Sequence, residues 1–154
     1  MLEIRRYQAD DYNEVWHLHV WALQLVGAYL GSGPWDNDLL DIEQAYLHNG
    51  GEFLVGTVHE RIVAMGAFKK TSPERAEIKR MRVHPDFQRR GYGQIMLDEL
   101  ERRAKTAGYA LLHLDTSVVQ TAAQKLYVKN GYKETGRVIL GGLECILFEK
   151  SIAN

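Results

Sequence analysis

The chain has 154 residues, enough for one hydrophobic core but short for two, so we expect a single domain. Apolar residues make up 45% and charged residues 25% of the chain, which is typical of a water-soluble globular protein rather than a disordered one. A formal net charge of −1 argues against a protein that coats nucleic acid, and no apolar run reaches the roughly 18 residues that span a membrane.

The N-terminal part is predicted to form a short strand at residues 2–7 and then a helix. Asp10 or Asp11 can cap this helix, which runs to about Tyr29. Its outer side also carries apolar residues, which leaves three alternatives open: a cleft wall, a partner subunit in a homodimer, or a helix deep in the core. The inner face comprises Val15, Trp16, Leu18, His19, Ala22, Leu23 and Val26. The apolar residues outside this face are Val20, Trp21 and Leu25.

A loop at residues 31–34 leads to a second predicted helix, which Asp38 caps and which ends at residues 49–51. We interpret the acidic run from Asp36 to Asp41 as helix capping and solvation. A hairpin follows, with strands at residues 53–58 and 62–68. The inward residues of the second helix are Leu39, Ile42, Tyr46 and Leu47.

The stretch from Ala76 to Leu100 organises the rest of the chain. A strand is predicted up to Val83 and ends at His84-Pro85, because the residue before a proline is disfavoured in the helical region. An amphipathic helix follows and ends at Gly108. The apolar stripe of that helix comprises Met96, Leu97, Leu100, Ala104 and Ala107.

Gly91 and Gly93 stand at the mouth of this helix, where backbone N–H groups can converge on an anion without interference from Cβ atoms. The helix dipole adds partial positive charge at the same point. Five basic residues against one acid give the region a charge of 5 − 1 = +4, so we expect a diphosphate there. The charged residues are Lys79, Arg80, Arg82, Arg89 and Arg90 against Asp86.

The C-terminal part is predicted to contain a strand at residues 109–116, a helix from Thr121 to Asn130, and a hairpin of residues 132–139 and 144–150. The resulting order, βααβββαβαββ, predicts an α/β fold with one mixed sheet and helices on both faces. The predicted strand of residues 76–83 carries too many charges for burial on both faces, so we expect part of it to line an open cleft.

Cys145, the only cysteine, lies beside three apolar residues, so we interpret it as a buried core thiol rather than a nucleophile. The lack of a disulfide partner and of a signal-like segment favours the cytoplasm. None of the six histidines shows metal-ligand spacing, so we predict no metal.

The glycine turn lacks the features of two common nucleotide sites. Gln94 and Ile95 follow Gly93 where a P-loop needs lysine and a hydroxyl, and Met96 stands where a dinucleotide site needs a small residue. The hexapeptide Gln88–Gly93 (QRRGYG) instead resembles the acyl-CoA signature of the GCN5-related N-acetyltransferase (GNAT) family. The preceding EIKRMRVHP and the later AQKLYVKNGY, from Ala123 to Tyr132, resemble the family as well.

This resemblance implies the GNAT fold, with splayed central strands, and acetyl-CoA as co-substrate. The pantetheine arm would then bond to the backbones of Met81, Arg82 and Val83, and the diphosphate would lie on the glycine turn. Gln120 stands where the family often has asparagine and can donate the same amide hydrogen bond. The residues assigned to the diphosphate are Gln88, Arg89, Arg90, Gly91, Tyr92, Gly93 and Gln94.

The resemblance also implies the chemistry: a neutral amine attacks the thioester of acetyl-CoA. Tyr127 is the expected general acid, and a backbone N–H near Met81 would meet the oxyanion. Glu77 is the candidate base, with a chain of water molecules as the alternative and Lys79 as its alternative ion-pair partner. Strand alternation predicts that Glu77, Lys79, Met81 and Val83 share one face.

In the family, the region of the first two helices lies over the acceptor side of the cleft. The expected function is an N-acetyltransferase acting on a primary amine of a small molecule or peptide. The alternative is a CoA-binding or regulatory module that catalyses nothing, which a cleft filled by Trp35 or Tyr46 would favour. The residues that would contact an acceptor are Trp35, Asp36, Asp38, Asp41, Glu43 and Tyr46.

Overall fold

The computed structural model of the chain describes residues 1–25, 27, 31 and 33–153. Val26, the predicted helix end near Tyr29 and part of the loop at residues 31–34 lie outside the described residues. None of the helices in the described part is long and apolar enough to cross a membrane.

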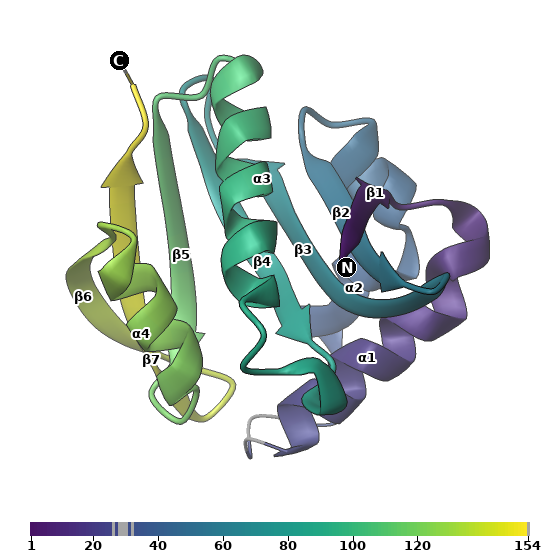
Figure 1. The fold of residues 1–154 in the computed structure, drawn as a ribbon. Helices are drawn as coiled ribbons and strands as arrows, with labels where there is room; N and C mark the ends of the chain where they lie inside the picture. Colours follow the sequence, from purple (N-terminus) through teal and green to yellow (C-terminus); the bar gives the residue numbers. More distant parts are fainter. Residues whose placement is uncertain (26, 28–30, 32, 154) are drawn as a thin grey trace.

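A single seven-stranded sheet forms the centre of the structure, with strand order β1-β2-β3-β4-β5-β7-β6 (Figure 1). All neighbours are antiparallel except β4 and β5, which are parallel. The element order and the mixed α/β sheet predicted from the sequence are confirmed. The strands are β1 (Glu3–Arg6), β2 (Glu52–Val58), β3 (Arg61–Lys70), β4 (Arg75–Val83), β5 (Leu111–Ser117), β6 (Lys133–Leu140) and β7 (Leu143–Ser151).

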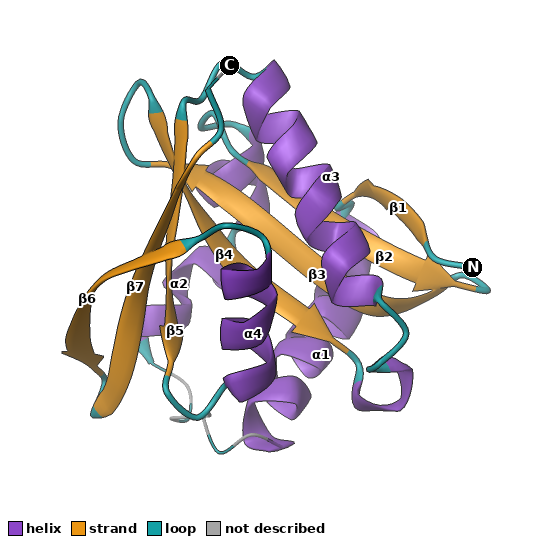
Figure 2. Ribbon diagram, turned by 60° about the vertical axis from the view of Figure 1, so that its left-hand side comes forward, coloured by secondary structure: helices purple, strands orange, loops and turns teal. Residues whose placement is uncertain are grey.

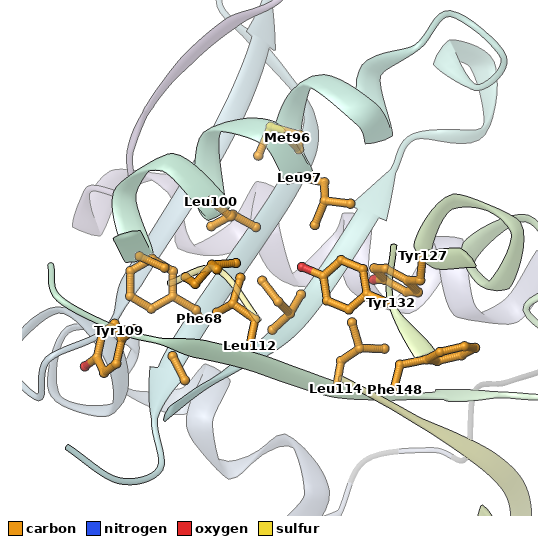
Figure 3. Close-up of a cluster of buried hydrophobic side chains, with 14 of the residues drawn as sticks. Phe68, Met96, Leu97, Leu100, Tyr109, Leu112, Leu114, Tyr127, Tyr132 and Phe148 are labelled. Atoms are coloured by element: carbon orange, nitrogen blue, oxygen red, sulfur yellow. The ribbon is translucent and has the colours of Figure 1, made fainter. Parts of the chain in front are cut away.

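Helices cover both faces of the sheet (Figure 2). On one face, α3 (Tyr92–Thr106) and α4 (Thr121–Lys129) pack over a core that includes Leu100 and Phe148 (Figure 3). On the other face, α1 (Tyr12–Leu25) and the segment around α2 (Asn37–Leu40) cover a second core, which includes Leu18 and Phe53. Because successive strand residues point to opposite faces, β2 and β3 contribute to both cores.

A β-bulge changes the direction of the side chains along β4. Met65 pairs with Arg82 and Ala67 with Lys79, so Arg80 and Met81 together oppose the single residue between them on β3. Arg80 adopts a left-handed φ of 61°. The prediction of one shared face is therefore wrong, because the extra residue turns Met81 and Val83 into the core beneath α3, away from Glu77 and Lys79.

The two halves of the sheet separate along the seam between β4 and β5. Pairing covers only Arg75–Leu111, Ala76–Leu112 and Glu77–His113, although β4 continues to Val83 and β5 to Ser117. The predicted splay of the central strands is confirmed. It leaves the charged part of β4 beside a gap, as its charges require.

The second predicted helix is broken, and its predicted cap is wrong. α2 ends where Asp41 adopts φ −147° and ψ 76°, and a short π-helical turn, η3 (Glu43–Leu47), follows. Asp38 lies inside α2, where its carboxylate bonds to distant side chains instead of the helix end. Leu39, Ile42 and Tyr46 are buried as predicted, while Leu47 is half-buried.

The start of α1 also differs from the prediction. Asp11 belongs to a 3₁₀ turn, η1 (Ala9–Asp11), where its carboxylate accepts the Gln8 N–H at 2.8 Å and pairs with Arg5 at 2.7 Å. Trp21 and Leu25 are 44% and 59% exposed, which overturns the alternative that α1 lies deep in the core.

Candidate active site

A cavity of about 280 Å³ opens where β4 and β5 part. Its walls come from β4, β5, the start of α4, and the turn between β6 and β7, with Leu23 and Trp35 on the α1 side. The cavity therefore brings together residues from Leu23 to Cys145, which are 122 positions apart in the sequence. The predicted site residues on the walls are Glu77, Met81, Arg82, Gln120 and Tyr127.

The start of α3 offers a row of free backbone donors. Gly91 precedes the helix with φ 80°, and a Cβ at this position would meet nothing within 4 Å. Among the described residues, no acceptor receives a backbone N–H from Arg89 through Gln94, whereas the Ile95 N–H donates to Gly91 at 3.1 Å. Six consecutive N–H groups are thus available to an anion.

The side chains of this turn are partly engaged within the protein. The Arg90 guanidinium lies 5.0 Å from the centre of the Phe87 ring. The Gln94 amide donates to Asp98 at 2.8 Å and to Asn130 at 2.7 Å. The anion-binding capacity of the turn therefore lies in its backbone more than in the Gln94 side chain.

Alternation along β4 determines which backbone groups face the gap. The His84 N–H donates to Val63 at 2.7 Å, so His84 and Arg82 direct their backbone groups to β3, and Met81 and Val83 direct theirs to the gap. The Met81 carbonyl accepts from Arg82 Nη1 at 2.7 Å, and the Val83 carbonyl accepts from Gln88 Nε2 at 3.2 Å. A ligand in the gap would meet two N–H groups directly and would displace side chains to reach the two carbonyls.

Tyr127 lies on α4 with its ring packed against Tyr132 and Phe148, at centroid distances of 5.5 and 6.2 Å (Figure 3). The residue is 4% exposed and lines the cavity. No hydrogen bond between described residues involves the hydroxyl of this cavity-lining tyrosine. Burial raises the pKa of Tyr127 despite the opposing Arg82 charge, so the hydroxyl holds its proton at neutral pH and can donate it.

Gln120 precedes α4, and only the oxygen of its side-chain amide is hydrogen-bonded within the protein. Its Oε1 accepts the Ser117 N–H at 3.2 Å and the Ser117 hydroxyl at 3.0 Å. Its Nε2 donates to no described residue, so the amide donor expected from the sequence is free.

Glu77 lies on the cavity wall, level with His113 of β5. Lys79 does not form the alternative ion pair with Glu77, since the described residues contain no such contact within 4.0 Å. Glu77 therefore keeps a carboxylate that no cation holds in place.

A buried network around Arg80 was not predicted. Arg80 binds Asp38 at 2.9 Å (Nε) and 2.5 Å (Nη2), Asp36 at 3.3 Å, and the Trp35 carbonyl at 2.6 Å. Tyr46 donates to Asp38 as well. The interpretation of Asp36 and Asp38 as capping and solvated residues is wrong, because both carboxylates serve this guanidinium.

The network extends to His19, whose Nε2 lies 3.0 Å from Asp36. Burial, together with the Arg82 and Arg80 charges, lowers the pKa of His19 to about 3, so the imidazole is neutral. Burial alone would raise the pKa of Asp38, but its hydrogen bonds with Arg80 and that charge lower it overall. These long-range pairs leave no local signal in the sequence.

Of the six residues expected to contact an acceptor, Trp35 lines the cavity. Asp41 and Glu43 are exposed on the surface, and Tyr46 is fully buried. The other two carboxylates are held by Arg80. Charged residues of β4 and β5 line the cavity instead.

Cys145 is buried, as predicted, and also forms part of the cavity wall. Its sulfur lies 3.7 Å from the Leu143 carbonyl, and burial raises the pKa of the thiol. In the part of the chain that the structure describes, no three His, Cys, Asp or Glu side chains are grouped to hold a metal ion.

Comparison with known proteins gives a consistent result. The family model described as Acetyltransferase (GNAT) family matches residues 5–132. An acetyltransferase of Yersinia pestis is 29% identical over 145 residues, covering 91% of this chain and 94% of the relative.

Solved structures share the fold. A GNAT-family acetyltransferase of Staphylococcus aureus superposes with a TM-score of 0.90 at 20% identity, covering 99% of both chains. A Salmonella typhimurium protein described as an acetyltransferase, solved with its cofactor acetyl-CoA, gives a TM-score of 0.81 at 18% identity, covering 98% of this chain and 94% of that one.

Proposed function

The chain belongs to the GNAT family of acetyltransferases, and from that premise we propose that it transfers the acetyl group of acetyl-CoA to a primary amine of a small molecule or peptide. The acceptor attacks directly, within a ternary complex of protein, acetyl-CoA and amine.

The free backbone donors at the start of α3 carry this proposal. Six unpaired N–H groups at a helix N-terminus suit the diphosphate of CoA, and the gap beside β4 leads from there to the cavity. The Met81 and Val83 N–H groups suit the amides of a pantetheine arm lying along the gap. The Salmonella protein solved with acetyl-CoA has the same fold, which supports this placement.

The chemistry requires an unprotonated amine, although a free alkylammonium has a pKa of about 10.4. Glu77 or a water molecule accepts the amine proton as nitrogen attacks the thioester carbon. The Met81 N–H stabilises the oxyanion while the C–N bond forms. The C–S bond then breaks, and Tyr127 donates its proton to the departing thiolate.

A CoA-binding module without catalysis is the competing function. It would require a side chain in the place of the acceptor. Trp35 stays at the edge of the cavity, 49% exposed, with its indole N–H donating to the Gly31 carbonyl at 3.0 Å. Tyr46 lies beneath, away from the cavity wall. Both positions support the enzyme.

The direct test measures release of free thiol from acetyl-CoA across a panel of primary amines, with CoA binding followed by calorimetry. We expect turnover with at least one class of amine. Binding of CoA without turnover for any amine would favour the module instead.

Tyr127→Phe removes only the hydroxyl that we assign as general acid. We expect turnover to fall by about tenfold to a thousandfold while CoA affinity changes little. Tyr12→Phe, at the start of α1 and away from the cavity, is the matched control and should behave as wild type. An unchanged rate for Tyr127→Phe would remove this residue from the mechanism.

A further inference from the structure

The cavity contains charged side chains of both signs that the protein does not pair. Glu77, Lys79, Arg82 and Asp115 line it, and among the described residues none of the four forms an ion pair within 4.0 Å. Arg80 differs, since it forms ion pairs with both Asp36 and Asp38. Two acids and two cations therefore face the same small space.

The bulge in β4 explains how the three β4 residues of this set come to share the cavity. Glu77 and Lys79 are two positions apart and lie on the same face of β4, toward α1. The extra residue at the bulge places Arg82 on that face as well, where it pairs with Met65 of the second core. Asp115 lies between Leu114 and Thr116 on β5, which are both buried, and is itself exposed.

Among these four side chains, within the described residues, Arg82 alone has a buried polar atom without a hydrogen-bond partner. Among the residues that the structure describes, the Arg82 side chain makes one hydrogen bond, from Nη1 to the Met81 carbonyl, and its buried Nε has no partner. Burial and the adjacent Arg80 charge lower the pKa of Arg82 to about 10, which still leaves it charged at neutral pH. Arg82 is half-buried, and a cation with a buried, unpartnered Nε and no close counter-ion is costly. Asp38 is held by Arg80. Asp36 contacts Arg80 through Oδ1 and keeps an unpartnered Oδ2, but among the described residues it forms no ion pair with Arg82 within 4.0 Å.

We propose that the acceptor is a primary amine that carries an anionic group, a carboxylate or a phosphate, within a few bonds of its nitrogen, and that Arg82 binds this group. Lys79 adds positive charge on the same side, while Glu77 and Asp115 attract the ammonium before it loses its proton. A free amino acid is the smallest molecule of this class. The inference rests on the proposed function and specifies its substrate.

The diphosphate of CoA is a poor candidate for this anion. The residues that offer it free N–H groups, Arg89 to Gln94, do not line the cavity. The pantetheine arm in the gap is uncharged. The oxyanion and the departing thiolate exist only during the reaction, so the source of a lasting anion beside Arg82 in the ternary complex is the acceptor.

The test compares amines that differ in one anionic group, with each rate expressed per unprotonated amine because that group also changes the pKa of the amine. Thiol release is measured with L-serine and L-serinamide, and with phosphoethanolamine and ethanolamine. In wild type we expect kcat/KM to be at least about tenfold higher for the anionic member of one pair, and the preferred pair distinguishes carboxylate from phosphate. Arg82→Gln should abolish that preference, mainly by raising KM for the anionic amine.

Arg82→Lys keeps the charge without the fork of donors, so it should retain part of the preference. Arg102→Gln, on the exposed side of α3, is the matched control and should retain all of it. Thermal melts of each variant establish that it folds. Equal rates for charged and neutral amines in wild type, or equal slowing of both by Arg82→Gln, would overturn the inference.

Failure of the proposed acetyl transfer can be distinguished from failure of the inference about the acceptor. If no amine supports thiol release, calorimetry with CoA-loaded protein still tests the inference, using L-serine and phosphoethanolamine as probes. Binding of one probe to wild type with at least tenfold weaker binding to Arg82→Gln supports it, and no binding of either probe to wild type overturns it.

Discussion

Arg80 joins the α1 side of the cavity to the sheet. Its guanidinium connects β4 with the segment from Trp35 to Asp38, 42 to 45 positions earlier in the chain. Only 10% of its side chain is exposed, so the ion pairs with Asp36 and Asp38 lie in a poorly solvated environment. Removing one partner of such a pair leaves a buried charge uncompensated.

We therefore predict that Arg80→Met lowers the free energy of unfolding by about 3–5 kcal/mol. Chemical denaturation measures the change. Adding Asp38→Leu should recover part of the loss, because it removes one of the two stranded carboxylates. A loss below about 1 kcal/mol for the single change would show that the pair contributes little.

His19 should make stability depend on pH. Its folded pKa of about 3 lies below the unfolded value of about 6.5, so below pH 6.5 the unfolded chain binds a proton that the folded protein excludes. Stability is full above pH 6.5 and falls as pH decreases toward 3, by about 1.4 kcal/mol between pH 7.5 and 5.5.

Denaturation at these two pH values, compared with His19→Gln, isolates this contribution from the other titrating groups. The variant should lose less stability than wild type over the interval. His48→Gln, an exposed histidine, serves as the control and should retain the wild-type dependence. The same slope in wild type and His19→Gln would refute the prediction.

At the scale of single elements, local pattern predicted β4 but not its bulge. Alternation of side chains has a period of two, and one inserted residue reverses it without any change in composition. Arg80 adopts the left-handed φ at the bulge, and because arginine rarely does so, its presence in the sequence does not indicate a bulge. The sequence could therefore place the strand but not decide which of its charges reach the cavity.

The second helix was mispredicted for a similar reason. Its apolar spacing fits a continuous helix, and Leu39, Ile42 and Tyr46 are indeed buried. The break at Asp41 accompanies contacts that only the folded sheet supplies, namely the bonds of Asp38 with Arg80 and Tyr46. The glycine turn before α3, by contrast, was predictable, because its requirement for glycine is local.

The start of α3 gives a prediction at this scale. Gly91→Val should weaken CoA binding by about tenfold or more, because the branched side chain would occupy the open space above Gly91 where a phosphate would lie. Calorimetry with CoA measures the loss. Gly108→Val, at the other end of the same helix, has φ 97° and equally open surroundings, so it controls for backbone strain. Unaltered affinity in Gly91→Val would contradict the placement of the diphosphate.

At the scale of the whole molecule, the sheet consists of two parts held together along a short seam. Three residue pairs join β4 to β5, and the rest of the seam is open to the cavity. The sequence predicted the element order from periodicity and turn residues. The splay followed only from the family resemblance, since nothing in the apolar pattern of either strand marks where pairing stops.

This architecture predicts how CoA should change the seam. If the pantetheine arm fills the gap as an added strand, the Met81 and Val83 amides gain acceptors, whereas the Arg82 amide already faces β3. Hydrogen exchange followed by NMR should then slow at Met81 and Val83 on saturation with CoA and stay unchanged at Arg82. Protection confined to residues 89–94 would mean that the diphosphate binds while the arm lies elsewhere. That result would contradict the placement of the thioester in the cavity.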